Sequence, residues 1–172
     1  LRLSWLEAYK SYQTVMMYNL GKAELISFKE STNTFPADAA GIEANVSAGT
    51  YNLTMFSQFP RQGFPALDYL INGLSDNDAA IVSFYVSKVK AASYKNYLTA
   101  VVMRLQSSID VIVSDWNNGY RDTYVAGNGT SVSSSVSKTT NNFVKNYERD
   151  IRSAKIGIPA GKLSGGATLP QN

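Results

Sequence analysis

The chain has 172 residues, of which 44% are hydrophobic and 17% are charged, and its formal net charge is +3. This composition is that of a folded domain rather than a disordered polymer, and no apolar run approaches the roughly 20 residues that cross a bilayer. The basic residues are scattered and are not interleaved with aromatic side chains, which argues against a nucleic-acid partner.

The first part of the chain predicts two helices and a connector between them. Apolar and aromatic residues recur every three or four positions near the N-terminus, which predicts a helix that Gly21 closes. These residues are Trp5, Tyr9, Tyr12, Met16 and Leu20. Residues 22–38 form the predicted connector, and Asp38 is suited to N-cap a second helix that breaks near Gly49.

The remainder of the chain also has helical periodicity. A turn over residues 59–63 precedes a short helix that ends at Gly73, and residues 75–78 (SDND) supply capping side chains for the helix that follows. Residues 78–124 predict a long helical stretch with one bend near 91–93, because a single apolar stripe runs along its second half. The stripe consists of Leu98, Val102, Leu105, Ile109, Ile112, Trp116 and Tyr120. After a loop rich in glycine and serine, the last helix is marked by Val136, Phe143, Tyr147, Ile151 and Ala154.

The fold class follows from this pattern. Five or six helices with short connections and no strand alternation predict an all-α fold, an antiparallel helical bundle. We expect the bundle to span residues 1–161 and residues 162–172 to form an irregular tail or the start of a linker. The chain begins without Met and shows no signal peptide, so we expect it to be a segment of a longer, processed protein.

Cysteine and histidine are both absent from the chain. Without cysteine there is no disulfide, no thiolate nucleophile and no Cys-ligated zinc. Without histidine there is no Ser-His triad and no imidazole metal ligand. Any metal that the chain binds would have oxygen ligands and would be a hard ion, such as iron or calcium.

One carboxylate falls within an apolar helical pattern. Residues 63–73 read GFPALDYLING, and Asp68 lies four positions after Phe64 and three before Ile71. An acid near the start of a helix complements the positive end of the helix dipole, which is one explanation. The other is a partly buried carboxylate that lines a cleft, paired with Arg61 or with a group from another segment.

This stretch and two others resemble the imelysin family of bacterial cell-envelope proteins. The family signature GxHxxE aligns with Gly63, Pro65 and Asp68. The N-terminal WLEAYKSYQTVMMYNLG is similar to an early helix of the family, and residues 157–161 match its G-I-P-x-G turn. Family members have been described as metallopeptidases and are related to periplasmic components of iron uptake.

The resemblance implies a second helical bundle and an exported protein. Longer family members carry a second bundle after the G-I-P-x-G turn, which is the expected partner of this one. Their location implies the periplasm or outer membrane, as a lipoprotein whose only membrane contact is an upstream lipid anchor.

The signature departs from the family at two positions. Pro65 stands where the family has His, and Asp68 stands where it has Glu, so the His/Glu pair of a peptidase is absent. The resemblance implies a ligand site at Asp68, Arg61, Gly63 and Pro65, with Asp68 as the metal ligand and no catalytic residue.

Three functions are therefore open. The first is a non-catalytic, imelysin-like envelope protein that binds a ligand or a hard metal ion in connection with iron uptake. The second is a structural or adhesion module that binds another envelope protein. The third is a metallopeptidase that takes its ligands from another part of the protein.

Overall fold

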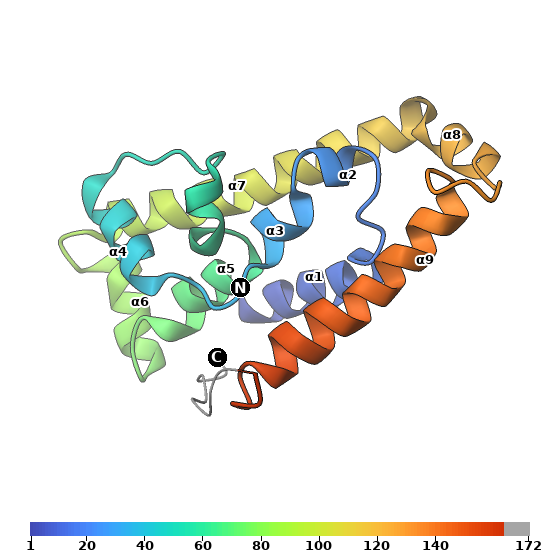
Figure 1. The fold of residues 1–172 in the computed structure, drawn as a ribbon. Coiled ribbons are helices and arrows are strands. Elements are labelled where there is room, and N and C mark those ends of the chain that lie inside the picture. The colour runs from blue at the N-terminus through green and yellow to red at the C-terminus, as the bar shows by residue number, and fades with distance from the viewer. Residues whose placement is uncertain (164–172) are drawn as a thin grey trace. The chain divides into compact units, whose positions relative to one another are not determined.

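Helices make up most of the chain, as Figure 1 shows. The computed structural model describes residues 1–163, and no strand occurs among them. The predicted all-α fold is therefore confirmed. Contacts divide the described residues into a first unit of residues 1–10 and 27–109 and a second unit of residues 11–26 and 110–163. The predicted tail lies outside the described residues, except for Lys162 and Leu163.

Two helices contribute residues to both units. They are α1 (Arg2–Val15) and α7 (Ala91–Asp115). The first unit also contains α3 (Phe28–Asn33), α4 (Ala39–Ala48), the 3₁₀ segment η1 (Phe56–Arg61), α5 (Gly63–Asp68), the π-helical segment η2 (Tyr69–Gly73) and α6 (Asp78–Val86). The second unit contains α2 (Lys22–Leu25), the π-helical η3 (Trp116–Tyr120), α8 (Arg121–Ala126), α9 (Ser135–Lys145) and the π-helical η4 (Asn146–Gly157).

The predicted helix starts and stops are confirmed where capping residues set them. The Asp38 carboxylate accepts a hydrogen bond from the Gly41 amide at 2.9 Å, which satisfies a free N–H at the start of α4. The same helix ends at Gly49, whose φ of 68° lies in the left-handed region. At the start of α6, the Asn77 side chain caps the Ala80 amide at 2.9 Å.

Other boundaries differ from the prediction. Helix α1 ends at Val15 rather than at Leu20, because the chain turns there through hydrogen bonds of short span, such as Tyr18 N–H to the Val15 carbonyl at 2.9 Å. The predicted connector contains α2 and α3, and α3 buries Ser31 and Thr32. Tertiary packing thus forms helices where the sequence carries no apolar stripe.

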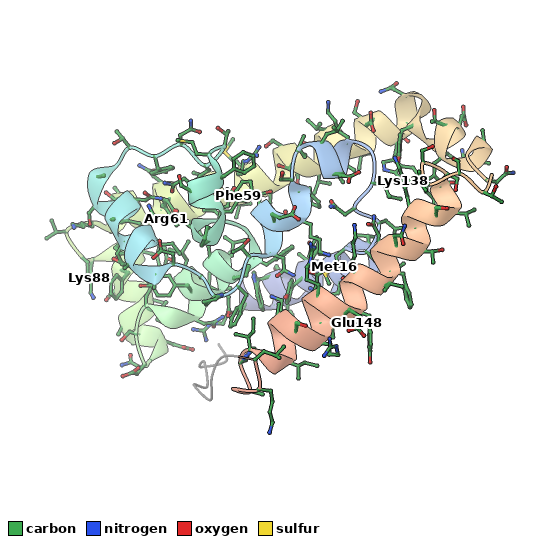
Figure 2. All side chains as sticks on the ribbon, in the orientation of Figure 1. Met16, Phe59, Arg61, Lys88, Lys138 and Glu148 are labelled. Atoms are coloured by element: carbon green, nitrogen blue, oxygen red, sulfur yellow. The ribbon has the colours of Figure 1, made fainter. Side chains whose placement is uncertain are left out.

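The long stretch after residue 78 breaks twice. Helix α6 ends at Val86, and Lys88 lies in the turn that follows (Figure 2). Its ammonium lies 3.2 Å from the centroid of the Phe84 ring. A second break lies in η3, where Gly119 has a φ of 119°. The structure therefore has more and shorter helices than the five or six expected.

The core of the first unit gathers apolar residues from α4, α5, η2 and α7. Full burial of one such side chain contributes roughly 1.5–3 kcal/mol. The core residues are Ile42, Val46, Leu53, Ala66, Leu67, Leu70, Tyr94, Tyr97 and Val101. Tyr97 is fully buried and its polar end is paired, because its hydroxyl donates to the Arg61 carbonyl at 2.7 Å and accepts from the Asn45 amide at 3.1 Å. The helix that carries Asp68 thus packs against a buried core whose polar groups are paired.

Candidate functional site

The stretch that carries Asp68 is held closely against its neighbours. Gly63 has a φ of 77°, and a Cβ added there would overlap the Thr32 carbonyl of α3. Pro65 is half-buried in the first turn of α5, where its missing N–H costs nothing. The Trp5 indole donates to the Phe64 carbonyl at 3.1 Å. Glycine and proline therefore serve the close packing of this helix in the structure.

Asp68 lies at the edge of the apolar face rather than within it. The neighbouring Leu67, Leu70 and Ile71 are buried, whereas Asp68 is half-buried. Its carboxylate accepts a hydrogen bond of 2.7 Å from the Asn72 amide, one turn later. The role of Asp68 as a ligand site stays a prediction.

The expected pairing of Arg61 with Asp68 is wrong. The Arg61 guanidinium donates instead to the Asp38 carboxylate at 2.8 Å, and Figure 2 shows Arg61 beside α4. Two hydrogen bonds, from the Gly41 amide and from Arg61, hold the pKa of Asp38 below its usual value. Because Asp38 already caps α4, it forms a fixed acceptor that lies within reach of Arg61. Arg61 thus joins η1 to the start of α4.

A second acid lies at the centre of a group of tyrosines. Glu43, on α4, is half-buried and accepts a hydrogen bond of 3.0 Å from the Tyr69 hydroxyl. Its other carboxylate oxygen accepts from the Tyr94 hydroxyl of α7. Tyr85 of α6 packs its ring against Tyr94, with centroids 6.1 Å apart, and donates to the Leu70 carbonyl at 2.6 Å. We call Glu43, Tyr69, Tyr85 and Tyr94 the Glu43 cluster.

The Glu43 cluster was missed by sequence reasoning. Its four residues are far apart in the chain, and its tyrosines fit ordinary core packing. One signal was present, since Glu43 directly follows Ile42 and precedes the apolar Val46 in a helix with few charges. Tyr69 is also the residue after Asp68, so the cluster adjoins the predicted site.

Burial and the nearby carboxylate shift the ionisation of these tyrosines. Desolvation first, and then the hydrogen bond to Glu43, raise the pKa of Tyr69 to about 12. Desolvation and the charge of Glu43 raise the pKa of Tyr85 to about 12. The same causes raise the pKa of Tyr94. All three phenols are therefore protonated at neutral pH, and Tyr69 and Tyr94 act as donors to Glu43.

We expect the chain to lose stability as the pH rises from 10 toward 12. The pKa of Tyr69 is raised from 10.0 to about 12 on folding, so in this range the unfolded chain has released a proton that the folded chain retains. The stabilisation is thus complete below pH 10 and is lost as the pH approaches 12. Urea unfolding at several pH values, with tyrosinate absorbance of the folded chain, measures this effect.

The variant Glu43→Gln separates the two causes of the shift. Because burial is the larger cause, the pKa of Tyr69 should fall in this variant but stay above 10.0. If every tyrosine of the folded, unsubstituted chain ionised near pH 10, the burial and hydrogen bonding described for the Glu43 cluster would be wrong.

The chain is thus an all-α protein in whose core a helix begins at Gly63 and carries Asp68 at the edge of its apolar face. The family model described as imelysin matches residues 1–170, so the chain belongs to the imelysin family. No curated protein and no solved structure matches the chain. Proteins of this family are generally exported. Within residues 1–163, no helix has the length and apolar character that crossing a membrane requires.

The residues at the family signature do not fit a peptidase metal. Pro65 has no lone pair to offer, and Asp68 is hydrogen-bonded to an amide. Among the described residues there is no group of three or more acidic, Cys or His side chains that could hold a metal ion. Phenolic oxygens of the Glu43 cluster lie next to the signature, because Tyr69 directly follows Asp68 and bonds Glu43.

Proposed function

We propose that this chain is a non-catalytic, imelysin-like protein of the bacterial cell envelope that binds a hard metal ion and serves iron uptake. The Glu43 cluster carries this proposal, because it places a half-buried carboxylate and two phenolic hydroxyls in direct contact. All of these donors are oxygens, which hard ions prefer. Membership of the family supports export, and the loss of the signature His argues against peptidase chemistry.

The compartment and the partner belong to the same proposal. We place the protein in the periplasm or at the outer membrane, as a lipoprotein held by an upstream lipid anchor. Its expected partner is a second helical bundle of the same protein.

Metal binding is tested with the purified chain. After dialysis against calcium or ferric citrate, elemental analysis should find about one hard ion per chain, as expected for a single oxygen-donor site. The bound ion should raise the melting temperature, because it binds the folded state in preference. A chain that retains neither ion and melts unchanged would overturn the proposal.

A second candidate function, a structural or adhesion module, is favoured by the outer face of α9 and η4. These segments run as one continuous helix (Figure 1), and its apolar residues are exposed, with Phe143 58% and Tyr147 56% accessible. The side that contacts its own unit is polar. Thr139 bonds Tyr124 at 2.7 Å, and Asn142 bonds the Asn19 carbonyl at 3.0 Å.

The amphipathic pattern of this helix is thus the reverse of that of an ordinary surface helix. An exposed apolar stripe of this kind is typical of a surface that another protein covers. If the chain binds no metal, binding of another protein at the exposed face of α9 and η4 becomes the better-supported function.

A further inference from the structure

The helix formed by α9 and η4 exposes apolar side chains along most of its length. Figure 2 shows this helix with Lys138 and Glu148 labelled. Its side toward the second unit is polar, so the fold of that unit does not use the exposed residues. We call the exposed apolar residues the α9 stripe, which consists of Val136, Phe143, Val144, Tyr147, Ile151 and Ile156. Only a surface outside the described residues 1–163 can cover the stripe.

The same helix carries the whole positive excess of the chain. Of the 16 basic and 13 acidic residues, five basic and two acidic ones lie in residues 135–157, which leaves eleven of each for the rest of the chain. Basic residues are scattered along the chain, but their excess over acids is confined to this helix. The five basic residues are Lys138, Lys145, Arg149, Arg152 and Lys155.

Ion pairs within the helix account for both of its acids. Arg152 donates to Glu148 at 2.7 Å, and Arg149 donates to Asp150 at 2.8 Å. The two acids are thus paired with the two arginines, and the positive excess of the helix corresponds to its three lysines.

The exposed lysines lie on the polar side of the helix. Lys138 and Lys145 are seven positions apart, and each follows a stripe residue by two positions, so they share a face that is not the stripe. A helix with its side chains is only about 10–12 Å across, and the Debye length is about 10 Å at 0.1 M salt. Both lysines are therefore close enough to attract an anionic surface that the stripe contacts.

The charge of the helix indicates which surface covers the stripe. A second copy of the chain would place two helices of net positive charge against each other, and like charges repel. Lysine is depleted in the cores of protein interfaces, whereas its methylene stem and charged end suit the boundary between lipid and water. An apolar stripe combined with basic residues on the polar side is typical of helices that lie on an anionic membrane.

We propose that the α9 stripe lies on the surface of an anionic lipid bilayer, with its apolar side chains among the headgroups and the lysines attracted to the lipid phosphates. Phe143 and Tyr147, one turn apart, supply aromatic rings, which are favoured at this depth. The helix lies in the plane of the membrane and does not cross it. This contact goes beyond the proposed function, because it needs no metal and is additional to the lipid anchor.

Vesicles of stated composition test the proposal. The purified chain should sediment with vesicles of phosphatidylglycerol and phosphatidylcholine in equal parts, and far less with vesicles of phosphatidylcholine alone. Salt at about 1 M shortens the Debye length to roughly 3 Å, so binding to the anionic vesicles should decrease.

Two double variants separate the apolar contribution from the charged one. Phe143→Ser with Tyr147→Ser should weaken binding to anionic vesicles roughly tenfold or more. Lys138→Gln with Lys145→Gln should weaken it roughly tenfold and make it less sensitive to salt. All four residues are exposed, so both variants should keep the fold, which circular dichroism checks.

Matched changes in the first unit serve as controls. Lys88→Gln with Lys90→Gln removes two exposed lysines, and Phe56→Ser removes an exposed aromatic ring. Both controls should bind anionic vesicles as the parent chain does. Equal losses in the controls and in the α9 variants would overturn the inference.

The absence of cysteine allows the contact to be located by labelling. Val144 of the stripe and Val82 of α6 have similar exposed fractions, 52% and 55%. Each is replaced by cysteine and labelled with a dye whose emission shifts in apolar surroundings. Anionic vesicles should shift the emission in Val144→Cys but not in Val82→Cys.

A chain that binds neither kind of vesicle, or binds both equally, would overturn the inference, and so would a dye shift in Val82→Cys alone. The α9 stripe would then be left to a protein partner. Metal binding is measured without lipid, so the proposed function stands or fails separately.

Discussion

Replacing Gly63 with alanine is expected to destabilise the chain by about 2–5 kcal/mol, a large part of the 5–15 kcal/mol typical of a domain. Two separate causes add. The φ of 77° is strained for any residue with a Cβ, and the added methyl would overlap the Thr32 carbonyl and lie 2.8 Å from the carbonyl oxygen of Ser31. Both obstacles are backbone atoms, so α3 and α5 must move apart. Urea unfolding measures the loss.

Gly49→Ala is the matched control for this result. Gly49 has a similar φ of 68°, but nothing lies within 4 Å of the added Cβ. Its loss should be only the strain of about 1–2 kcal/mol. Equal losses in the two variants would show that α3 and α5 do not pack as closely as described.

Replacing Gly41 with alanine is expected to destabilise the chain by about 1–2 kcal/mol, although alanine is the better helix former. The added methyl would overlap both the Arg61 guanidinium and the Asp38 carboxylate. The ion pair must then open, and the cap of α4 is disturbed with it. The pair is partly exposed, so solvent screening limits its share of the loss.

A double-mutant cycle with Arg61→Ala checks this explanation. Once the guanidinium is absent, only the Asp38 carboxylate still meets the methyl. The cost of Gly41→Ala should then be smaller than in the parent chain. If the cost is the same in both backgrounds, Arg61 does not occupy the space beside Gly41.

The stretch around Asp68 shows how far sequence reasoning extends at the site. The helix, its glycine start and its end at Gly73 follow from local rules, and so does the presence of an acid near the apolar face. The partner of that acid does not follow. Arg61 is only seven positions away, yet it binds Asp38, because Asp38 is already held in place as the cap of α4.

The Glu43 cluster lies beyond what a single sequence can predict. Its residues come from α4, η2, α6 and α7, and no spacing rule connects them. Three buried or half-buried tyrosines are equally consistent with plain packing. Only the folded chain brings two hydroxyls to one carboxylate and so distinguishes a polar cluster from a hydrophobic one.

By itself, the sequence determined the all-α class, the caps of α4 and α6, and the exclusion of thiol and imidazole chemistry. These depend on residue type and on spacing within a few turns, where interactions are local. Tertiary structure alone decided that α3 forms within a predicted connector, that Arg61 pairs with Asp38, and that the apolar face of α9 is exposed. Each of these outcomes depends on contacts between segments distant in the chain, whose free energies outweigh local propensity.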